Sequence, residues 1–443
     1  MKTPIHKLAL AAALLLSTLN AQLSTARAQG SLTPAGAPAA TMKSLAQVEP
    51  RTPISAAPFT INNSGSYYLT TNLTVAGGNA ITIATNGVTL DLGGFTIAST
   101  AASATGTGIL LNSGLRNLTI QNGFIRGGVT NNGSNIYNGS GFQDGINYSS
   151  TAPVNTRVAG VSVAGCSGNG IYLFIGDSTV VESCTVRTVG GYGMMATVIK
   201  SSAALDCGNS AIYGNLVSDS NGQCNGSGYG LSAFGAAQNC YGSSSSGYGL
   251  SAFTVLNCVG VSSSSYGLAA STAQNCYGTS GSSYGLYAVT AQNCYGYSGS
   301  NTGLYVNNTA QNCYGYCNGN TFGLFTAIAL SCYGSSSNSV GLFATTAHDS
   351  FGTSNGSGTG LSAYAAENCY GSSYSGQGLG AYIAQNCIGS SGSGTGLATA
   401  YLAIGCFGTS TSGTGLQTSI ANSCHGTSTS GTAQSITYKY NMP

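Results

Sequence analysis

The hexapeptide Ala291-Gln292-Asn293-Cys294-Tyr295-Gly296 is one copy of a unit that recurs along the second half of the chain. Its cysteine position returns every 18 or 19 residues, and a glycine follows two residues later in each of the eleven copies. A Gly-Leu pair such as Gly285-Leu286 stands between copies. Repeats this short cannot bury an apolar face alone, so they must stack as a β-solenoid whose coils rise about 4.8 Å each. The repeating position is occupied by Cys240, Cys258, Cys276, Cys294, Cys313, Cys332, Ser350, Cys369, Cys387, Cys406 and Cys424.

The first half of the chain carries short apolar runs that also predict strands. Each run has three to five residues of β-branched or aromatic alternation and is cut by Asn-Gly or Gly-Gly turns. No helical stripe of useful length follows the first 28 residues. The expected strands are 66–69, 72–75, 80–83, 88–92 and 95–97.

Two segments of this half, Gly65-Ser66-Tyr67-Tyr68-Leu69 and Val88-Thr89-Leu90-Asp91-Leu92-Gly93-Gly94-Phe95, resemble the opening of secreted bacterial β-helix proteins. Their fold is similar to that of pectate lyases, and the resemblance covers roughly residues 45–215. It implies an all-β, single-stranded, right-handed parallel β-helix with coils of 18–19 residues. It implies little about activity, because a fold does not fix a function.

The N-terminus is typical of an export signal. Lys2 and Lys7 precede the apolar run 8–16, and Ala26-Arg27-Ala28 fits a cleavage site. Eight basic residues then remain against nine acidic ones, which gives no footprint for nucleic acid or an anionic membrane. No later run is long enough to span a membrane. The predicted organisation is a signal peptide (1–28), a flexible leader (29–58), irregular β-helix coils (59–219), the regular array (220–433) and a C-terminal cap (434–443) that covers the open edge of the solenoid.

Equal phase in the repeat places the cysteines in one column along the axis. We interpret them as small buried core residues, with disulfides between neighbouring coils as the alternative in an exported protein. The spacing is not that of a zinc site, and only three histidines are present. The residue before the cysteine is often Asn, which tolerates a left-handed backbone and predicts a hydrogen-bonded ladder at a bend. These asparagines are Asn239, Asn257, Asn275, Asn293, Asn312, Asn368 and Asn386.

The residue after the cysteine is often aromatic, and strand alternation turns it outward if the cysteine points inward. Such a ladder of rings either binds the sugar rings of a polysaccharide or packs on itself to shield the coils. The absence of Trp favours packing. The candidate ligand-facing residues are Tyr241, Tyr277, Tyr295, Tyr314, Tyr333, Phe351, Tyr370 and Phe407.

Charged side chains concentrate in residues 116–219, whereas residues 220–347 contain no Asp, Glu, Lys or Arg. Cleavage of a polysaccharide needs carboxylates, alone or with a base, that meet at one site. The phases do not converge: Asp206 precedes Cys207 as the bend Asn precedes its cysteine, and Glu182 lies two residues before Cys184. No catalytic residue is therefore assigned. The acids are Asp144, Asp177, Glu182, Asp206 and Asp219, and the bases are Arg116, Arg126, Arg157, Arg187 and Lys200.

These patterns predict an exported structural or interaction solenoid, at the cell surface, in the periplasm or in the medium. A polysaccharide or a cell-envelope component is the expected partner, with no nucleic acid, no membrane span, no cofactor and no metal, and the chain is expected to be monomeric. The alternative is a polysaccharide lyase or glycoside hydrolase with its site in residues 116–219.

Overall fold

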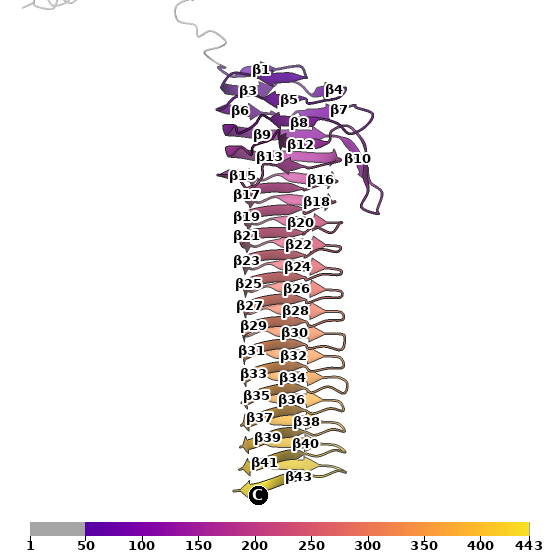
Figure 1. Ribbon diagram of the computed structural model, residues 1–443, viewed down its shortest axis with the longest axis vertical. Helices are drawn as coiled ribbons and strands as arrows, with labels where there is room; N and C mark the ends of the chain where they lie inside the picture. The colour runs from indigo at the N-terminus through magenta and orange to yellow at the C-terminus, as the bar shows by residue number, and fades with distance from the viewer. Residues whose placement is uncertain (1–48, 443) are drawn as a thin grey trace, which may run out of the picture. The chain divides into compact units, whose positions relative to one another are not determined.

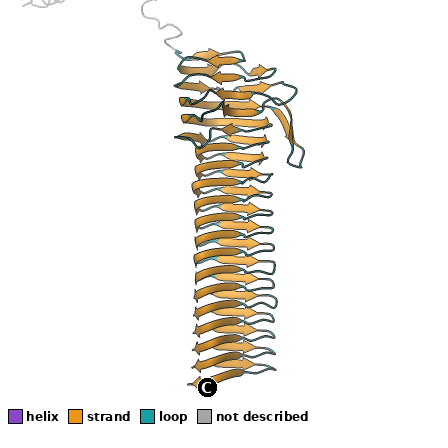
Figure 2. Ribbon diagram, in the orientation of Figure 1, coloured by secondary structure: helices purple, strands orange, loops and turns teal. Residues whose placement is uncertain are grey.

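The computed structural model describes residues 49–442, and the chain from Arg51 onward forms one unit of stacked β-coils (Figure 1). It has about 20 turns, and the described residues contain strands and loops but no helix (Figure 2). The predicted all-β parallel solenoid with coils of about 19 residues is confirmed. No helix within 49–442 is long and apolar enough to cross a membrane. The predicted signal peptide, residues 1–28, lies outside the described residues.

The N-terminal coils are built from short strands that pair in parallel with strands of the next coil. They are β1 (Thr52–Ile54), β2 (Phe59–Ile61), β3 (Gly65–Leu69), β4 (Leu73–Val75), β5 (Ile81–Ile83), β6 (Val88–Asp91), β7 (Thr96–Ser99), β8 (Thr107–Leu111), β9 (Arg116–Arg126), β12 (Asp144–Tyr148), β13 (Val154–Cys166), β14 (Ile171–Tyr172), β15 (Thr179–Glu182), β16 (Thr185–Val189), β17 (Met194–Lys200), β18 (Ala203–Cys207), β19 (Ile212–Ser218) and β20 (Asn221–Cys224).

The regular array alternates a long and a short strand in each coil. The long strands are β21 (Leu231–Gln238), β23 (Leu250–Leu256), β25 (Leu268–Gln274), β27 (Leu286–Gln292), β29 (Leu304–Gln311), β31 (Leu324–Leu330), β33 (Leu342–His348), β35 (Leu361–Glu367), β37 (Leu379–Gln385), β39 (Leu397–Ile404), β41 (Leu416–Asn422) and β43 (Gln434–Tyr440). The short strands are β22 (Tyr241–Ser244), β24 (Val259–Ser262), β26 (Tyr277–Ser280), β28 (Tyr295–Ser298), β30 (Tyr314–Cys317), β32 (Tyr333–Ser336), β34 (Phe351–Ser354), β36 (Tyr370–Ser373), β38 (Ile388–Ser391), β40 (Phe407–Ser410) and β42 (His425–Ser428).

Each long strand turns a corner near its middle. In β23, Leu250, Ala252 and Val255 are buried, whereas Phe253 and Thr254 are exposed in succession. Strand alternation would bury every second residue, so two outward side chains in a row mark the corner. The pairing of β23 with β25 omits Phe253 for the same reason. The long strand therefore contributes two sides of the coil and the short strand a third.

The bend between the long and the short strand is made by the predicted asparagines. All seven have φ between 51° and 53°, in the left-handed region that Asn tolerates better than most residues. Their side chains bond from coil to coil: Asn275 Nδ2 donates to Asn257 Oδ1, and Asn293 Nδ2 donates to Asn275 Oδ1, both at 3.1 Å. The predicted asparagine ladder is confirmed.

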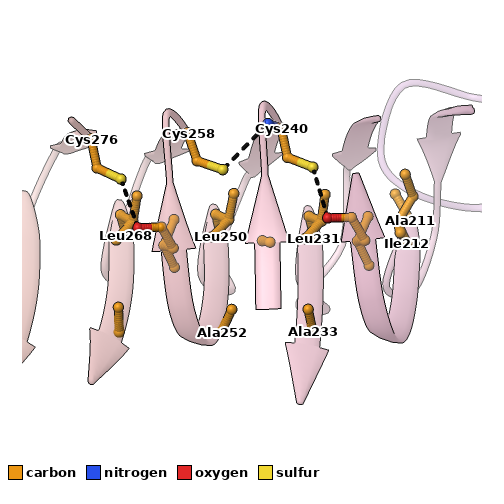
Figure 3. Packing of buried hydrophobic residues seen from close by; sticks show 14 of the residues in the cluster. Ala211, Ile212, Leu231, Ala233, Cys240, Leu250, Ala252, Cys258, Leu268 and Cys276 are labelled. Atoms are coloured by element: carbon orange, nitrogen blue, oxygen red, sulfur yellow. Dashed lines mark hydrogen bonds between the residues drawn. The ribbon is translucent and has the colours of Figure 1, made fainter. Parts of the chain in front are cut away.

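The cysteine column faces the core, next to the leucine that begins each long strand (Figure 3). All fifteen cysteines are buried and free. The thiol of Cys240 donates to the carbonyl oxygen of Gln238 at 3.1 Å, and the Cys240 N–H donates to Sγ of Cys258 at 3.3 Å. Burial raises the pKa of Cys184, which begins this column, to about 11. The cysteines of this column are therefore buried free thiols, and they are not paired in disulfides.

Glycine two residues after the cysteine allows two sides of the coil to approach closely. A Cβ on Gly296 would lie 2.3 Å from the carbonyl oxygen of Gly303 and 2.9 Å from Cα of Leu304. No side chain fits there without moving the backbone. Two residues further on, Ser298 points inward, donates to the carbonyl of Ser283 at 2.6 Å and accepts from the Asn301 N–H at 2.8 Å. This second buried column, made of serines, therefore provides hydrogen-bond partners for backbone groups of the turns.

The N-terminal boundary and one insertion differ from the prediction. The first strand, β1, lies ahead of the expected start at Phe59, and Ile54 in β1 is fully buried against the core. Pro53 lies in this strand, which pairs only with β3; Pro is tolerated in an edge strand. An antiparallel hairpin of β10 (Gly128–Asn131) and β11 (Tyr137–Ser140) projects beside the stack (Figure 1). At the other end β43 pairs with β41.

Candidate functional site

The predicted aromatic ladder forms an outward column at the first residue of the short strands. The rings lie on one another along the axis, with centroids 4.7 Å apart for Tyr277 and Tyr295 and for Phe351 and Tyr370. Tyr277 is 41% exposed, and burial raises the pKa of Tyr295 to about 12. The column is interrupted by Val259 and by Ile388, where the ring stack is broken. The rings between these two positions therefore both point outward and pack on one another.

Asp206 does not occupy the bend position that its place before Cys207 predicts. Cys207 pairs with Val189 and with Cys224, which in turn pairs with Ser244 of the serine column. The sequence motif is therefore displaced to another side of the coil. The bend position two coils above Asn257 is Asp219, with φ 50°, and its Oδ1 accepts from Asn239 Nδ2 at 2.9 Å.

Asp206 instead anchors the projecting hairpin. Its Oδ1 accepts from Tyr137 Oη at 2.8 Å, from Asn131 Nδ2 at 2.7 Å and from Asn225 Nδ2 at 2.6 Å. Burial alone would raise the pKa of Asp206, but these hydrogen bonds outweigh it and lower that pKa. The pKa of Tyr137 is raised, by burial first and by Asp206 second. The carboxylate is thus held charged as an acceptor.

The remaining acids and bases form local contacts rather than one reactive cluster. Glu182 on β15 forms ion pairs with Arg157 and, at 2.6 Å, with Lys200 Nζ. Asp144 on β12 is buried and accepts from the Asn169 N–H at 2.7 Å. Asp206 lies on β18, which pairs with β16 and belongs to another side of the coil than β15. Among the described residues, no group of three or more His, Cys, Asp or Glu side chains could hold a metal.

A groove of about 760 Å³, which we call the bend groove, runs along the bends at the N-terminal end of the aromatic ladder. Small residues replace the rings there, as at Thr185, Ala203 and Asn221, and Tyr241 ends the groove. Asp219 is its only carboxylate. Retaining and inverting glycosidases both use a pair of carboxyl groups, whereas the lining of this groove supplies one.

A second hollow, which the sequence analysis did not find, lies on the side formed by the first half of the long strands. It has a volume of about 440 Å³, and we call it the first recess. Its floor is Ser232, Ser251 and Ala269, each the residue after the leucine of its coil. Small side chains at three successive coils leave the space open.

Aromatic rings close the first recess at both ends and along the corner. Tyr213 meets Phe234 edge to face at 5.1 Å at one end, and Tyr287 stacks on Tyr266 at 5.7 Å at the other. Phe253 stands on the corner and is 63% exposed. Burial raises the pKa of Tyr213, so its hydroxyl remains a donor at neutral pH. No charged side chain lines this recess.

The recess depends on an exchange between two neighbouring outward columns. The residues that follow the leucines form one column along the axis, which we call the floor column. The residues at the corners form another, which we call the corner column. At β21 and β23 the floor is Ser and the corner is Phe; at β27 and β29 the floor is Tyr and the corner is Val289 or Asn307. Asn307 Nδ2 donates to Tyr287 Oη at 2.8 Å, which fixes the end wall. Alignment of the Gly-Leu pairs would have revealed this exchange in the sequence.

Comparison with protein-family models, with curated proteins and with solved structures finds no match to this chain. The site is therefore interpreted from its own geometry.

Proposed function

We propose that this chain is an exported solenoid that binds a neutral polysaccharide in the first recess without cleaving it. The observation that carries the proposal is the recess itself: about 440 Å³, walled by Tyr and Phe rings and floored by Ser and Ala, with no charged side chain in its lining. Pyranose rings present C–H faces that pack on aromatic rings and hydroxyls that bond Ser and Tyr. Export rests on the N-terminal pattern and on the resemblance to secreted bacterial β-helix proteins.

Absence of charge favours a neutral rather than an acidic polymer. An acidic polysaccharide would need basic side chains for its carboxylates, and residues 220–347 supply none. The recess is also rigid, because its floor belongs to paired strands, so little ordering entropy opposes binding.

The test is retention of the purified protein on insoluble β-1,4-glucan, β-1,4-xylan, β-1,4-mannan and α-1,4-glucan, with polygalacturonate and alginate as acidic counterparts. We expect retention by a neutral polymer, and loss of it in Phe253→Ser. The protein already carries Ser271 in the corner column two coils on from Phe234, so the substitution suits the backbone. Tyr277→Ser is the matched variant in the predicted ladder. Retention that depends on Tyr277 rather than Phe253 would move the site to that ladder.

A polysaccharide lyase or hydrolase remains the alternative, and its candidate carboxylate is Asp219, which lines the bend groove. The same incubations are assayed for new reducing or unsaturated ends. Products that disappear in Asp219→Asn would establish this activity and overturn the proposal of binding without cleavage.

A further inference from the structure

The long-strand side carries a second hollow of about 410 Å³, which we call the second recess. Its floor is Ser362, Gly380 and Ala398, which occupy the same floor column as Ser232, Ser251 and Ala269. Once more three successive coils have small residues at this position. The two recesses thus repeat the same arrangement on the same side of the solenoid.

The exchange of columns repeats as well. Where the floor becomes small again, the corner becomes aromatic: Tyr364 and Tyr382 stack with centroids 4.9 Å apart, and Tyr382 and Tyr401 lie 5.6 Å apart. Tyr364 is 59% exposed. Of the six coils that supply the floors of the two recesses, five carry an aromatic residue at the corner, and the exception is Ser271 of β25. Corner rings therefore accompany the small floor at both recesses.

A continuous stack of rings joins the two recesses. Tyr287, Tyr305, Phe325 and Phe343 fill the floor column between them, with centroids 5.6, 4.8 and 5.1 Å apart. Each ring pairs in register with the next, so the stack follows the solenoid axis. From Ser232 to Ser362 the column advances seven coils, or about 34 Å at the rise of a β-ladder.

The lining of the second recess is polar but uncharged. Gln377 and Gln417 contribute side-chain amides, which both donate and accept hydrogen bonds, and Thr399 lies at its edge. This set suits sugar hydroxyls and carries no charge to pair with an acidic or basic ligand. The two recesses therefore share an uncharged lining, aromatic in the first and amide-bearing in the second.

We propose that the second recess binds the same neutral polysaccharide, and that one chain laid along the axis occupies both recesses across the ring stack. This inference rests on the proposed function of the first recess. Two linked sites raise the apparent affinity only for ligands long enough to span them, by about 10²- to 10⁴-fold. Short fragments bind each recess separately, two per protein.

The experiment is calorimetric titration with size-fractionated fragments of whichever neutral polymer retains the protein, below and above the length that spans the recesses. We expect two short fragments per protein, one long fragment per protein, and at least tenfold tighter binding of the long one. Gly380→Tyr should fill the second recess, leave one short fragment per protein and remove the length dependence. A Cβ on Gly380 meets only the flexible Gln377 Oε1 within 3 Å, and Tyr305 shows that this column accepts Tyr. Ala398→Tyr is the second variant if Gly380→Tyr does not fold.

The outcomes separate the two proposals. One short fragment per protein, with no length dependence and no effect of Gly380→Tyr, would overturn the second recess and leave the first. Failure of every neutral polymer to bind would overturn both. Two fragments per protein that persist in Gly380→Tyr and Ala398→Tyr would place the second site elsewhere and refute the assignment.

Discussion

Replacing Gly296 by Ala tests the close approach of two sides of the coil. The added Cβ would lie 2.3 Å from the Gly303 carbonyl oxygen and 2.8 Å from its carbon. Carbon atoms in contact prefer about 3.5 Å or more, so the two sides would have to separate by roughly 1 Å. Overpacking of a rigid interior costs about 1–3 kcal/mol, and because the obstacle is paired backbone we expect about 3 kcal/mol here.

Gly380→Ala is the matched control within the same array. Its Cβ would meet the mobile end of Gln377 at 2.6 Å and otherwise nothing nearer than 3.6 Å. Removing a glycine also restricts the unfolded chain, which stabilises by about 0.4–1 kcal/mol where the backbone allows it. We therefore expect a free energy of unfolding within about 0.5 kcal/mol of the parent protein.

The assay is chemical denaturation followed by far-ultraviolet circular dichroism, with hydrogen exchange to locate the effect. Solenoid coils contact only their neighbours, so loss of protection in Gly296→Ala should centre on β28 and β29. Equal stability of Gly296→Ala and Gly380→Ala would refute the close approach and, with it, the reason for a glycine two residues after each cysteine.

Three further predictions concern the thiols, the hairpin and the C-terminal end. The native protein should resist alkylation by iodoacetamide at neutral pH and take up fifteen equivalents after denaturation and reduction, because all fifteen thiols are buried away from the reagent; several rapidly alkylated sites in the native protein would contradict this. Asp206 has a lowered pKa in the fold, so its contribution to stability is present above the unfolded pKa near 4 and is lost as the pH falls through the folded value. Asp206→Asn should therefore remove part of the acid limb of a stability profile and increase hydrogen exchange of β10 and β11, and an unchanged profile would argue against the anchor. Deleting residues 434–443 should promote oligomers on a sizing column, because the strand edge of β41 would then be bare; monomeric elution would contradict it.

The fold could be predicted because a repeat of fixed period specifies every coil in the same way. The cysteine and asparagine columns follow from phase alone: Cys294 alternates inward, and Asn293 takes the left-handed bend that Asn tolerates. The position of a motif in the repeat gave a wrong prediction outside the regular array. Asp206 and Cys207 look like a bend pair, but the bend of that coil is made by Ser201 (φ 49°), and Cys207 lies at the end of the following short strand.

The recesses could not be predicted from the hexapeptide because they lie outside it. Alignment of the Gly-Leu pairs reveals small residues in the same column at three successive coils, but only the corner of the long strand shows that Ser251 floors a hollow beside Phe253. The ladder that contains Tyr277 is the more regular pattern in the sequence, but its regularly spaced rings pack on one another. The binding surface proposed here arises where the pattern changes.

Ser251→Tyr tests most directly whether the first recess holds the ligand. The floor column already accepts Tyr at positions 287 and 305, so the variant should fold with its recess filled. Ser243→Tyr is the matched control on the short strands, where Tyr297 occupies the equivalent position. In calorimetric titration with a short neutral fragment, we predict that Ser251→Tyr loses one fragment per protein, Ser243→Tyr loses none, and added salt changes neither affinity. Unaltered stoichiometry in Ser251→Tyr, or binding that weakens steeply with salt, would contradict it.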